Sequence, residues 1–475
     1  MSARFVSRAA IVFLIVFASA ATAQPARLPA PVAQALARAG IPQTAVGIVV
    51  QDSLNGTIVV AHEKDVPFNP ASTIKLLTTY AALDQLGPAY RWNTEVYAGG
   101  PIENEVLQGD LIIKGYGDPS LTLENFWLLL RSLRARGVRD IRGDLVLDTS
   151  FFAPTSDDPG DFDGEPARPY NTVPNALLVN FKSIRLEFLP DVVRNAVQII
   201  TEPALPQVSI VNNLKLDIGE CGDWAEKLRA DIQDNGNVAR LAFNGSFSTV
   251  CGEQVRHYSV LGHRQYVHGL FTTLWRELGG SFAGAVREGT APTGVRPFFV
   301  YPTQPVAEII RDVNKFSNNV MARQLYLTFG AIALGAPASN EKSATAIRNW
   351  LVSKRLLFPE LVLENGSGLS RAERISATSL AQLLLTAYRG AVAPEFVSSL
   401  PVVAADGTMK SRLNATPVAG QAHVKTGTLA NVRAMAGYVL DERSHPFVVV
   451  CLISHARAAE GRAAQDALLQ WVYRH

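Results

Sequence analysis

The chain has 475 residues, of which 48% are hydrophobic and 18% charged, as is typical of a globular protein with a substantial core. Its formal net charge is +2, and both surplus basic residues, Arg4 and Arg8, lie within residues 1–23, so residues 24–475 carry a formal charge of 2 − 2 = 0. This neutral balance argues against nucleic acid as a partner.

Residues 1–23 have the three parts of a secretory signal peptide. Two arginines precede an apolar run at residues 9–20, and the small residues Ala21-Thr22-Ala23 follow it. We therefore expect cleavage after Ala23 and a periplasmic protein with at most peripheral membrane association. The same segment could instead be an uncleaved membrane anchor.

The pattern of residues 31–86 predicts a helix, two strands and a second helix in that order. Residues 31–38 form the first helix candidate, and residues 44–50 and 57–62 are strand-like runs joined by a hairpin signal. Apolar residues then recur at helical spacing up to Leu86, and Gly87 ends that helix.

A different pattern begins at about residue 91. Strand-like runs at residues 110–114 and 144–148 flank a helical segment at 124–136. Residues 152–170 are rich in Pro, Asp and Gly and predict a long loop, and short β-type runs fill most of residues 177–247.

The C-terminal third returns to helices and ends in strands. Helical periodicity covers residues 306–315, breaks at Ser317-Asn318-Asn319 and then resumes. The last predicted elements are three strands and a closing helix, at residues 423–429, 435–440, 447–454 and 458–473. Strands at both ends of the chain predict one sheet built from residues 24–90 and 280–475, with residues 91–279 inserted into that domain.

The three cysteines predict one disulfide and no metal site. Cys221 and Cys251 lie in one β-rich segment and, in an exported protein, could pair. Cys451 lies inside an apolar strand-like run and is expected to be a buried small hydrophobe. Because the cysteines do not form a Cys-x-x-Cys pattern and the histidines are scattered, we expect neither a metal nor a cofactor.

Ser72 and Lys75 lie three residues apart at the start of the second predicted helix. On a helix, positions i and i+3 share a face about 5–6 Å apart, so the amine can reach the hydroxyl. Ser72 is therefore a candidate nucleophile with Lys75 as its base. The motif is short, and an ordinary exposed helix start would show the same pattern.

Two further motifs follow in chain order. Ser317-x-Asn319 falls in the break between two helices, and Lys425-Thr426-Gly427 falls on a predicted strand. Together with Ser72-x-x-Lys75, they are the three motifs of penicillin-recognising serine acyltransferases. Their order and their structural contexts argue against coincidence.

The chain resembles the D-alanyl-D-alanine carboxypeptidase/endopeptidase family, the class C low-molecular-mass penicillin-binding proteins. Residues 69–76, 114–121, 365–371 and 424–428 carry the resemblance, which extends over essentially the whole mature chain. The separation of 317 − 72 = 245 residues between the first two motifs matches the family's inserted domains, which serine β-lactamases lack. The resemblance implies an α/β, β-lactamase/transpeptidase-like domain, with a five-stranded antiparallel sheet and helices, and a large, mostly β insertion.

The resemblance also implies a role for each motif residue. Lys75, neutral because it is buried beside Lys425, would accept the Ser72 proton. Ser317 would pass that proton to the leaving amine, and Asn319 would hold the substrate amide.

The third motif is expected to hold the end of the substrate. Lys425, with Thr426 and Thr428, offers a cation and hydroxyl groups for the peptide's terminal carboxylate. The backbone N–H groups of Ser72 and Thr428 would form the oxyanion hole. Gly427 would leave room for the substrate along the strand.

Two more substrate-binding candidates follow from the resemblance. Arg371 ends a segment similar to the family's Asp-Gly-Ser-Gly-Leu-Ser-Arg, in which Asn365 replaces the aspartate. Arg371 could pair with a stem-peptide carboxylate or form an ordinary surface ion pair. In the insertion, Glu165 and Tyr170 fall where the family carries an acid and an aromatic residue that recognise a free amine, and spacing favours Glu165 over Asp163.

The sequence therefore predicts a serine DD-carboxypeptidase/DD-endopeptidase that acts on peptidoglycan peptides through an acyl-enzyme on Ser72 and is inhibited covalently by β-lactams. A serine β-lactamase or a D-aminopeptidase or esterase on the same fold is an alternative. A non-catalytic wall-binding module is the alternative from a different class. The oligomeric state is left open.

Overall fold

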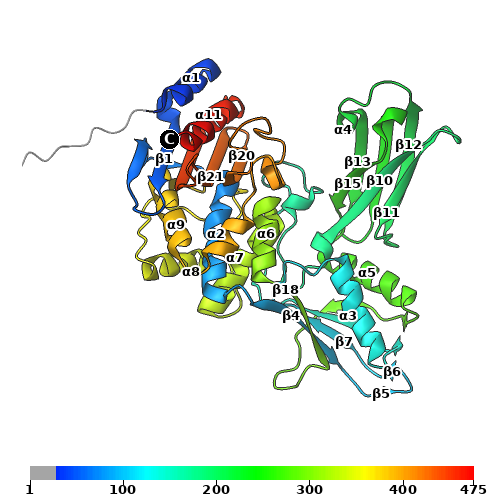
Figure 1. Cartoon of the computed structure of the whole chain (residues 1–475). Helices are drawn as coiled ribbons and strands as arrows, with labels where there is room; N and C mark the ends of the chain where they lie inside the picture. The colour runs from blue at the N-terminus through cyan, green and yellow to red at the C-terminus, as the bar shows by residue number, and fades with distance from the viewer. Residues whose placement is uncertain (1–27) are drawn as a thin grey trace, which may run out of the picture.

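The computed structural model describes residues 28–475 (Figure 1). The expected signal peptide, residues 1–23 with cleavage after Ala23, lies outside the described residues. Within residues 28–475, none of the helices is both long enough and apolar enough to cross a bilayer.

The two ends of the described chain share one antiparallel sheet, in the order β2-β1-β22-β21-β20. The N-terminal part supplies two of its strands and the C-terminal part three. These strands are β1 (Val46–Asp52), β2 (Ile58–His62), β20 (Ala422–Leu429), β21 (Val432–Leu440) and β22 (Pro446–Ser454). The expected five-stranded sheet assembled from both ends is therefore confirmed.

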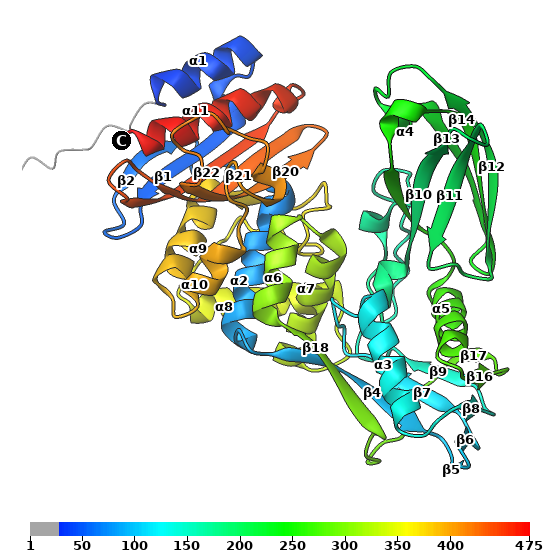
Figure 2. The ribbon, with the colours of Figure 1, turned by 45° about the vertical axis from the view of Figure 1, so that its right-hand side comes forward.

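Helices cover both faces of this sheet (Figure 1, Figure 2). Val449 and Ile453 of β22 join the core beneath α1 and α11. Val450 and Leu452 point to the other face and pack with the remaining helices, because side chains alternate along a strand. The helices are α1 (Ala30–Ala39), α11 (Arg462–Tyr473), α2 (Lys75–Leu86), α6 (Val306–Lys315), α7 (Asn319–Leu334), α8 (Asn340–Ser353), α9 (Ala377–Arg389) and α10 (Ala393–Ser399).

The inserted region has two parts, which Figure 2 shows to the right of the five-stranded sheet and its helices. The first part contains a second five-stranded sheet, β17-β9-β7-β4-β18, and a small sheet, β16-β8-β6-β5, with α3 and α5 in the same core. Its elements are β4 (Arg91–Ala98), β5 (Ile102–Glu103), β6 (Val106–Leu107), β7 (Leu111–Lys114), α3 (Leu123–Ala135), β8 (Asp140–Ile141), β9 (Leu145–Asp148), α5 (His263–Glu277), β16 (Ser281–Phe282), β17 (Val286–Glu288) and β18 (Phe299–Pro305).

The predicted end of the insertion, residue 279, is too early. β16, β17 and β18 pair with β8, β9 and β4, so the inserted region continues to Pro305. These strands have no recognisable sequence pattern, because β16 and β17 are only two and three residues long and β18 contains Pro302 and Pro305. Proline is tolerated in β18 because that strand lies at the edge of its sheet.

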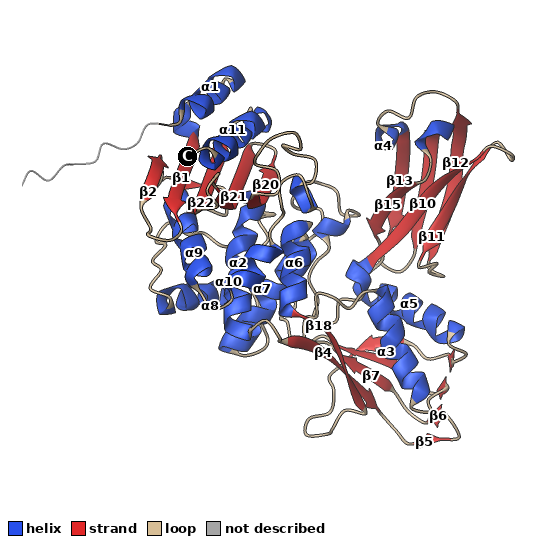
Figure 3. Ribbon diagram, in the orientation of Figure 1, coloured by secondary structure: helices blue, strands red, loops and turns tan. Residues whose placement is uncertain are grey.

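The second part of the insertion is a pair of three-stranded sheets, coloured as strands at the right of Figure 3. Phe188 of one sheet and Phe243 of the other meet edge to face in the shared core, with ring centroids 5.3 Å apart. The two sheets contain β10 (Ser183–Asp191), β11 (Ala196–Glu202) and β15 (Gln254–Ser259), and β12 (Val208–Asp217), β13 (Leu228–Asp234) and β14 (Ala239–Ser248).

The cysteines are arranged as expected. Cys221 and Cys251 form a disulfide that ties the segment before the short helix α4 (Trp224–Lys227) to the end of the turn after β14. Cys451 is a free, fully buried thiol in β22.

One short strand pair brings distant segments together beside the first motif. β3 (Pro67–Phe68) pairs with β19 (Ile375–Ser376). The residues that precede Ser72 therefore lie next to the segment that follows Arg371.

Candidate active site

Ser72 lies in a 3₁₀ turn, Ala71–Ile74, that runs directly into α2. Asn69 fixes this turn, because its side-chain oxygen accepts from the Ala71 N–H at 2.8 Å and its amide nitrogen donates to the Ser370 carbonyl at 3.0 Å. Ala71 has φ = 44°, a left-handed conformation that alanine rarely adopts and that is often found at functional sites. The expected helix start is thus a tighter, strained turn.

Lys75 is fully buried beside the candidate nucleophile. Its Nζ lies 3.1 Å from Ser72 Oγ, donates to Asn319 Oδ1 at 2.6 Å and also donates to the Ser367 carbonyl oxygen. Burial, and then the charge of Lys425, hold the pKa of Lys75 well below its usual value, while Glu373 opposes that shift. A neutral amine at this distance can accept the hydroxyl proton.

Lys425 and Ser317 form the second contact between motifs. Lys425 is fully buried, and its Nζ donates to Ser317 Oγ at 2.9 Å and to the Thr426 carbonyl at 2.6 Å. Burial lowers the pKa of Lys425 to about 7. Ser317 has φ = 58° in the break between α6 and α7, and Asn319 begins α7. The structure therefore brings together Ser72, Lys75, Ser317, Asn319 and Lys425.

β20 lies at the edge of its sheet; its outer side pairs with Val402 at His423, and no strand pairs with that side along the third motif. A Cβ atom at Gly427 would lie 2.8 Å from the Pro70 carbonyl oxygen and 2.9 Å from the Ser72 nitrogen, so only glycine fits there. Thr428 follows, and its Oγ1 accepts from Arg433 at 2.7 Å. Thr426 Oγ1 donates to Thr408 Oγ1 at 2.9 Å.

The loop that contains Asn365 closes the site from the other side. Asn365 Oδ1 accepts from the Ser367 N–H at 3.0 Å, which keeps the turn that an aspartate would make. Gly368 has φ = 81°, and a Cβ on it would lie 2.0 Å from the Ala71 carbonyl oxygen. This close approach brings the Ser367 carbonyl oxygen into hydrogen-bonding contact with Lys75 Nζ.

Glu373 is a fully buried carboxyl group that holds the same loop. Its Oε1 accepts from the backbone N–H groups of Glu364, Asn365 and Gly366, each at 3.2 Å, and its Oε2 has no partner among the described residues. Burial raises the pKa of Glu373. Glu373 was not predicted from the sequence, because it belongs to none of the three motifs. The one available signal was Asn365, which lacks the negative charge of the aspartate that the family carries at that position.

Arg371 contacts the inserted region. It is exposed, its Nη2 donates to the Phe162 carbonyl at 2.9 Å, and its guanidinium lies over the Phe162 ring. A cavity of about 560 Å³ lies between the 157–173 segment and residues 363–371. Arg371 therefore lines a groove between the inserted loop and the loop that contains Asn365.

The acid that contacts Tyr170 is Asp163 and not Glu165, and which of the two recognises a substrate amine stays a prediction. The Tyr170 hydroxyl donates to Asp163 Oδ2 at 2.8 Å, and Asn171 Nδ2 donates to Asp163 Oδ1 at 2.8 Å. Glu165 instead lies 3.5 Å from Arg168 Nε. The chain between Asp163 and Tyr170 turns so that these two side chains meet, and their spacing in the sequence does not predict this contact.

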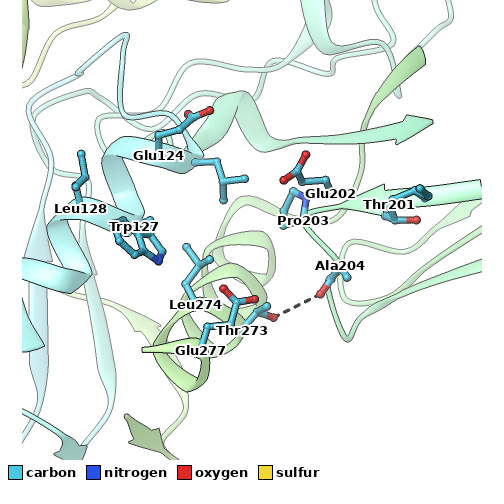
Figure 4. A pocket seen from close by; sticks show the side chains of 12 residues that line it. Glu124, Trp127, Leu128, Thr201, Glu202, Pro203, Ala204, Thr273, Leu274 and Glu277 are labelled. Atoms are coloured by element: carbon cyan, nitrogen blue, oxygen red, sulfur yellow. Dashed lines mark hydrogen bonds between the residues drawn. The ribbon is translucent and has the colours of Figure 1, made fainter. Parts of the chain in front are cut away.

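A second cavity, of about 710 Å³, lies in the inserted region between α3, α5 and the segment after β11 (Figure 4). Trp127, Leu128 and Leu274 give it an apolar lining, and Glu124, Glu202 and Glu277 line it as well. None of these residues belongs to the three motifs, so this cavity takes no part in the chemistry at Ser72.

The sheet, the helices and the three converging motifs define a serine acyltransferase of the penicillin-recognising class. The chain belongs to the D-Ala-D-Ala carboxypeptidase 3 (S13) family, whose model matches residues 28–475. The enzyme class predicted from the sequence, a serine D-Ala-D-Ala carboxypeptidase, is thereby confirmed.

Two relatives and one solved structure span most of the chain. It is 24% identical over 413 residues to D-alanyl-D-alanine carboxypeptidase DacB of Haemophilus influenzae, covering 86% of this chain and 85% of the relative. It is 27% identical over 417 residues to the D-alanyl-D-alanine carboxypeptidase of Actinomadura sp. strain R39, covering 83% and 74%. Its fold is similar to the crystal structure of penicillin binding protein 4 (dacB) from Haemophilus influenzae, with a TM-score of 0.77, 23% identity and coverage of 94% of this chain and 99% of that one.

Proposed function

We propose that Ser72 is the nucleophile and Lys75 the general base of a DD-peptidase that acts on peptidoglycan stem peptides. The observation that carries this proposal is the 3.1 Å separation of Lys75 Nζ and Ser72 Oγ at a fully buried position. The lowered pKa of Lys75 supports a neutral amine that can take the hydroxyl proton.

In acylation, Ser72 Oγ attacks the carbonyl carbon of the penultimate D-alanine and its proton passes to Lys75. The backbone N–H groups of Ser72 and Thr428 stabilise the oxyanion that forms, by about 3 kcal/mol for each donor. The C–N bond then breaks, and the leaving amine takes a proton through Ser317, which accepts from Lys425 at 2.9 Å. Water attacks the acyl-enzyme in the second half of the reaction.

The substrate backbone lies along β20, because an unpaired edge strand offers hydrogen bonds to an extended peptide. Gly427 allows β20 to lie against Ser72, and Thr426 faces the end of the peptide. The Asn319 amide, oriented by its bond to Lys75, donates to a substrate carbonyl.

Both a terminal D-alanine and the donor amine of a cross-link can leave from this arrangement. We therefore expect carboxypeptidase and endopeptidase action, and slow, covalent inhibition by β-lactams at Ser72.

Mass spectrometry of purified muropeptides, monomeric and cross-linked, tests the reaction. The enzyme should remove one D-alanine from the monomer or split the cross-link, and Ser72→Ala should do neither. An intact, folded protein that neither cleaves these peptides nor takes fluorescent penicillin would instead be a wall-binding module.

Two assays distinguish a DD-peptidase from the related enzyme classes that share its catalytic residues. With a chromogenic cephalosporin, a peptidase should release one burst of product and then hydrolyse almost no more. Sustained hydrolysis would identify a β-lactamase. Turnover of D-amino-acid amides or simple esters, without turnover of muropeptides, would identify a D-aminopeptidase or esterase.

The proposed site of action is the periplasm. The leader ending at Ala23 and the Cys221–Cys251 disulfide both support export, because disulfides persist in oxidising compartments. N-terminal sequencing of the mature protein should begin at Gln24, and a mature protein that still begins at Met1 would contradict this.

A further inference from the structure

The cavity drawn in Figure 4 lies where the two parts of the insertion meet. α3 and α5 of the first part line it, together with the end of β11 and residues 203–204 of the second part. Its volume of about 710 Å³ is that of an ordinary ligand site, since such pockets measure roughly 300–1,000 Å³. A space of this size admits side chains of another molecule.

The lining of this cavity is largely apolar and partly open to water. Leu128 of α3 and Ile200 of β11 are 39% and 40% exposed, and Trp127 and the buried Leu274 lie in the same lining. Phe126, next to Trp127 on α3, belongs to the core of the insertion, so this wall is held in place. A rigid apolar surface exposed to water is stabilised when an apolar group from outside covers it.

Three carboxylates and no basic side chain line the same cavity. Glu124, Glu202 and Glu277 come from α3, β11 and α5, and Figure 4 shows them around the space beside the apolar side chains. Of the basic groups in the described chain, only that of Arg185 approaches one of these carboxylates, at 4.0 Å from Glu202. Negative charge on several sides of an apolar surface attracts a ligand that carries cations beside an apolar group.

Glu277 lies at the end of α5 that disfavours a negative charge. It is the last residue of that helix, where the helix dipole favours a cation. Glu124, in contrast, lies in the first turn of α3, where a carboxylate is favoured. A cation bound between the two helices would therefore stabilise Glu277, which its own helix does not.

These features favour a basic peptide over other ligands. A stem peptide with free carboxylates, or an anionic phospholipid, would place negative charge against the three glutamates. A polyamine would neutralise the glutamates but leave the apolar lining exposed to water. A peptide with an apolar side chain between two basic ones meets both, and its backbone N–H groups can donate to the Ala204 carbonyl, whose bond from Thr273 is 3.5 Å long.

We propose that this cavity is the docking site for a segment of a partner protein in which a large apolar side chain lies between two lysine or arginine residues. The apolar side chain packs on Trp127, Leu128 and Leu274, and the basic side chains pair with Glu124 and Glu277. The insertion thereby recruits a partner at a site separate from the chemistry at Ser72.

Saturation-transfer difference NMR on the mature chain tests the site with three peptides, each acetylated and amidated: Arg-Leu-Arg, Arg-Ser-Arg and Glu-Leu-Glu. We expect saturation of the leucine methyl groups of Arg-Leu-Arg and no binding of Glu-Leu-Glu. Arg-Ser-Arg should bind about tenfold or more weakly than Arg-Leu-Arg, because it buries no apolar side chain.

Two variants assign this binding to the cavity. Glu124→Gln/Glu277→Gln and Trp127→Ala should each weaken Arg-Leu-Arg about tenfold or more, because each removes one half of the proposed contact. Glu226→Gln is the matched control, because Glu226 is an exposed glutamate of the insertion that does not line the cavity, and it should bind like the wild type. Penicillin acylation at the wild-type rate shows that each variant is folded.

Three results would overturn the proposal. They are equal binding of Arg-Leu-Arg and Glu-Leu-Glu, undiminished binding of Arg-Leu-Arg by Glu124→Gln/Glu277→Gln, and no binding by the wild-type chain at millimolar peptide. Both glutamates are exposed, so the test of charge stands even where Trp127→Ala does not fold.

Discussion

The candidate active site contains two buried lysines, Lys75 and Lys425, and their contacts give them different roles. Lys75 touches the nucleophile, whereas Lys425 touches Ser317 and has a pKa of about 7. The positive charge of Lys425 helps to lower the pKa of Lys75, so the two groups titrate as a coupled pair. We therefore expect Lys75 to start the reaction neutral and Lys425 to supply the proton that Ser317 passes on.

Lys75→Arg tests this division of roles. An arginine keeps the positive charge but does not lose its proton, so acylation by penicillin should fall by about three orders of magnitude. Non-covalent peptide binding should remain measurable. Stopped-flow acylation rates of Lys75→Arg and of the wild type would be compared, and a near wild-type rate in Lys75→Arg would show that another group is the base.

Glu373 gives a prediction about pH. Its negative charge favours the protonated form of Lys75, so Glu373→Gln should lower the Lys75 pKa further. The neutral base then persists to lower pH, and the acidic limb of the acylation rate profile should move to lower pH by up to about one unit.

Glu364→Gln is the control for that shift, because Glu364 belongs to the same loop but bonds to Ser370 instead. Its profile should match the wild type. A Glu373→Gln profile that keeps its acidic limb, or moves it to higher pH, would show that Glu373 does not act on the base.

At the scale of elements, loops rather than helices or strands set the geometry of the site. The 3₁₀ turn at Ser72, the break at Ser317 and the Gly368 loop all use left-handed backbone angles, at Ala71, Ser317 and Gly368. At Ala71 and Ser317, which carry a Cβ, such angles are retained only where surrounding contacts over-determine them. The inserted loop at Phe162 lines the groove beside Arg371.

We propose Asp163 in place of Glu165 as the acid that recognises the substrate amine, because Asp163 is the one that contacts Tyr170. With a substrate that has a free amine on its third residue, Asp163→Ala should raise KM about tenfold or more, because a charged hydrogen-bonded pair is lost. Glu165→Ala should change KM by less than about twofold, since an exposed ion pair with Arg168 contributes little. Steady-state kinetics with the same peptide acetylated on that amine would be the control. The reverse order of the two variants would restore the sequence-based assignment.

Local sequence patterns predicted the elements that make up the site, but not all of its contacts. Ser72-x-x-Lys75 and Lys425-Thr426-Gly427 were found because each is a short run with its own chemistry. Glu373 was missed because its effect on Lys75 of α2, from a loop 373 − 75 = 298 residues away in the chain, arises only when the chain folds. The boundary at residue 279 was wrong for the same reason: the strands beyond it are defined by pairing with β4, β8 and β9.

At the scale of the whole molecule, specific side-chain contacts join the loop of the inserted region to the catalytic domain. The guanidinium of Arg323 on α7, mostly buried, pairs with Asp157 of the inserted loop at 2.8 Å. Arg371 reaches Phe162 of the same loop. The paired sheets that hold the disulfide lie farther out, beyond α5 (Figure 2).

The disulfide should therefore stabilise the insertion without affecting the chemistry. It closes a loop of 30 residues, so Cys221→Ser/Cys251→Ser should lower the free energy of unfolding of this part by about 3 kcal/mol. Thermal unfolding with and without reductant would measure that loss, and penicillin acylation at a temperature below the transition should stay within about twofold of wild type. A variant that folds but no longer acylates would contradict this separation.

The central claim is that Ser72 carries the acyl group. Peptide mapping by mass spectrometry after incubation with benzylpenicillin tests it most directly, with Ser72→Ala and Ser317→Ala treated in parallel. We predict one penicilloyl adduct per molecule, on the peptide that contains Ser72, which is absent in Ser72→Ala and still forms, more slowly, in Ser317→Ala. An adduct on another residue, or an adduct that persists in Ser72→Ala, would contradict the assignment of Ser72 as the nucleophile.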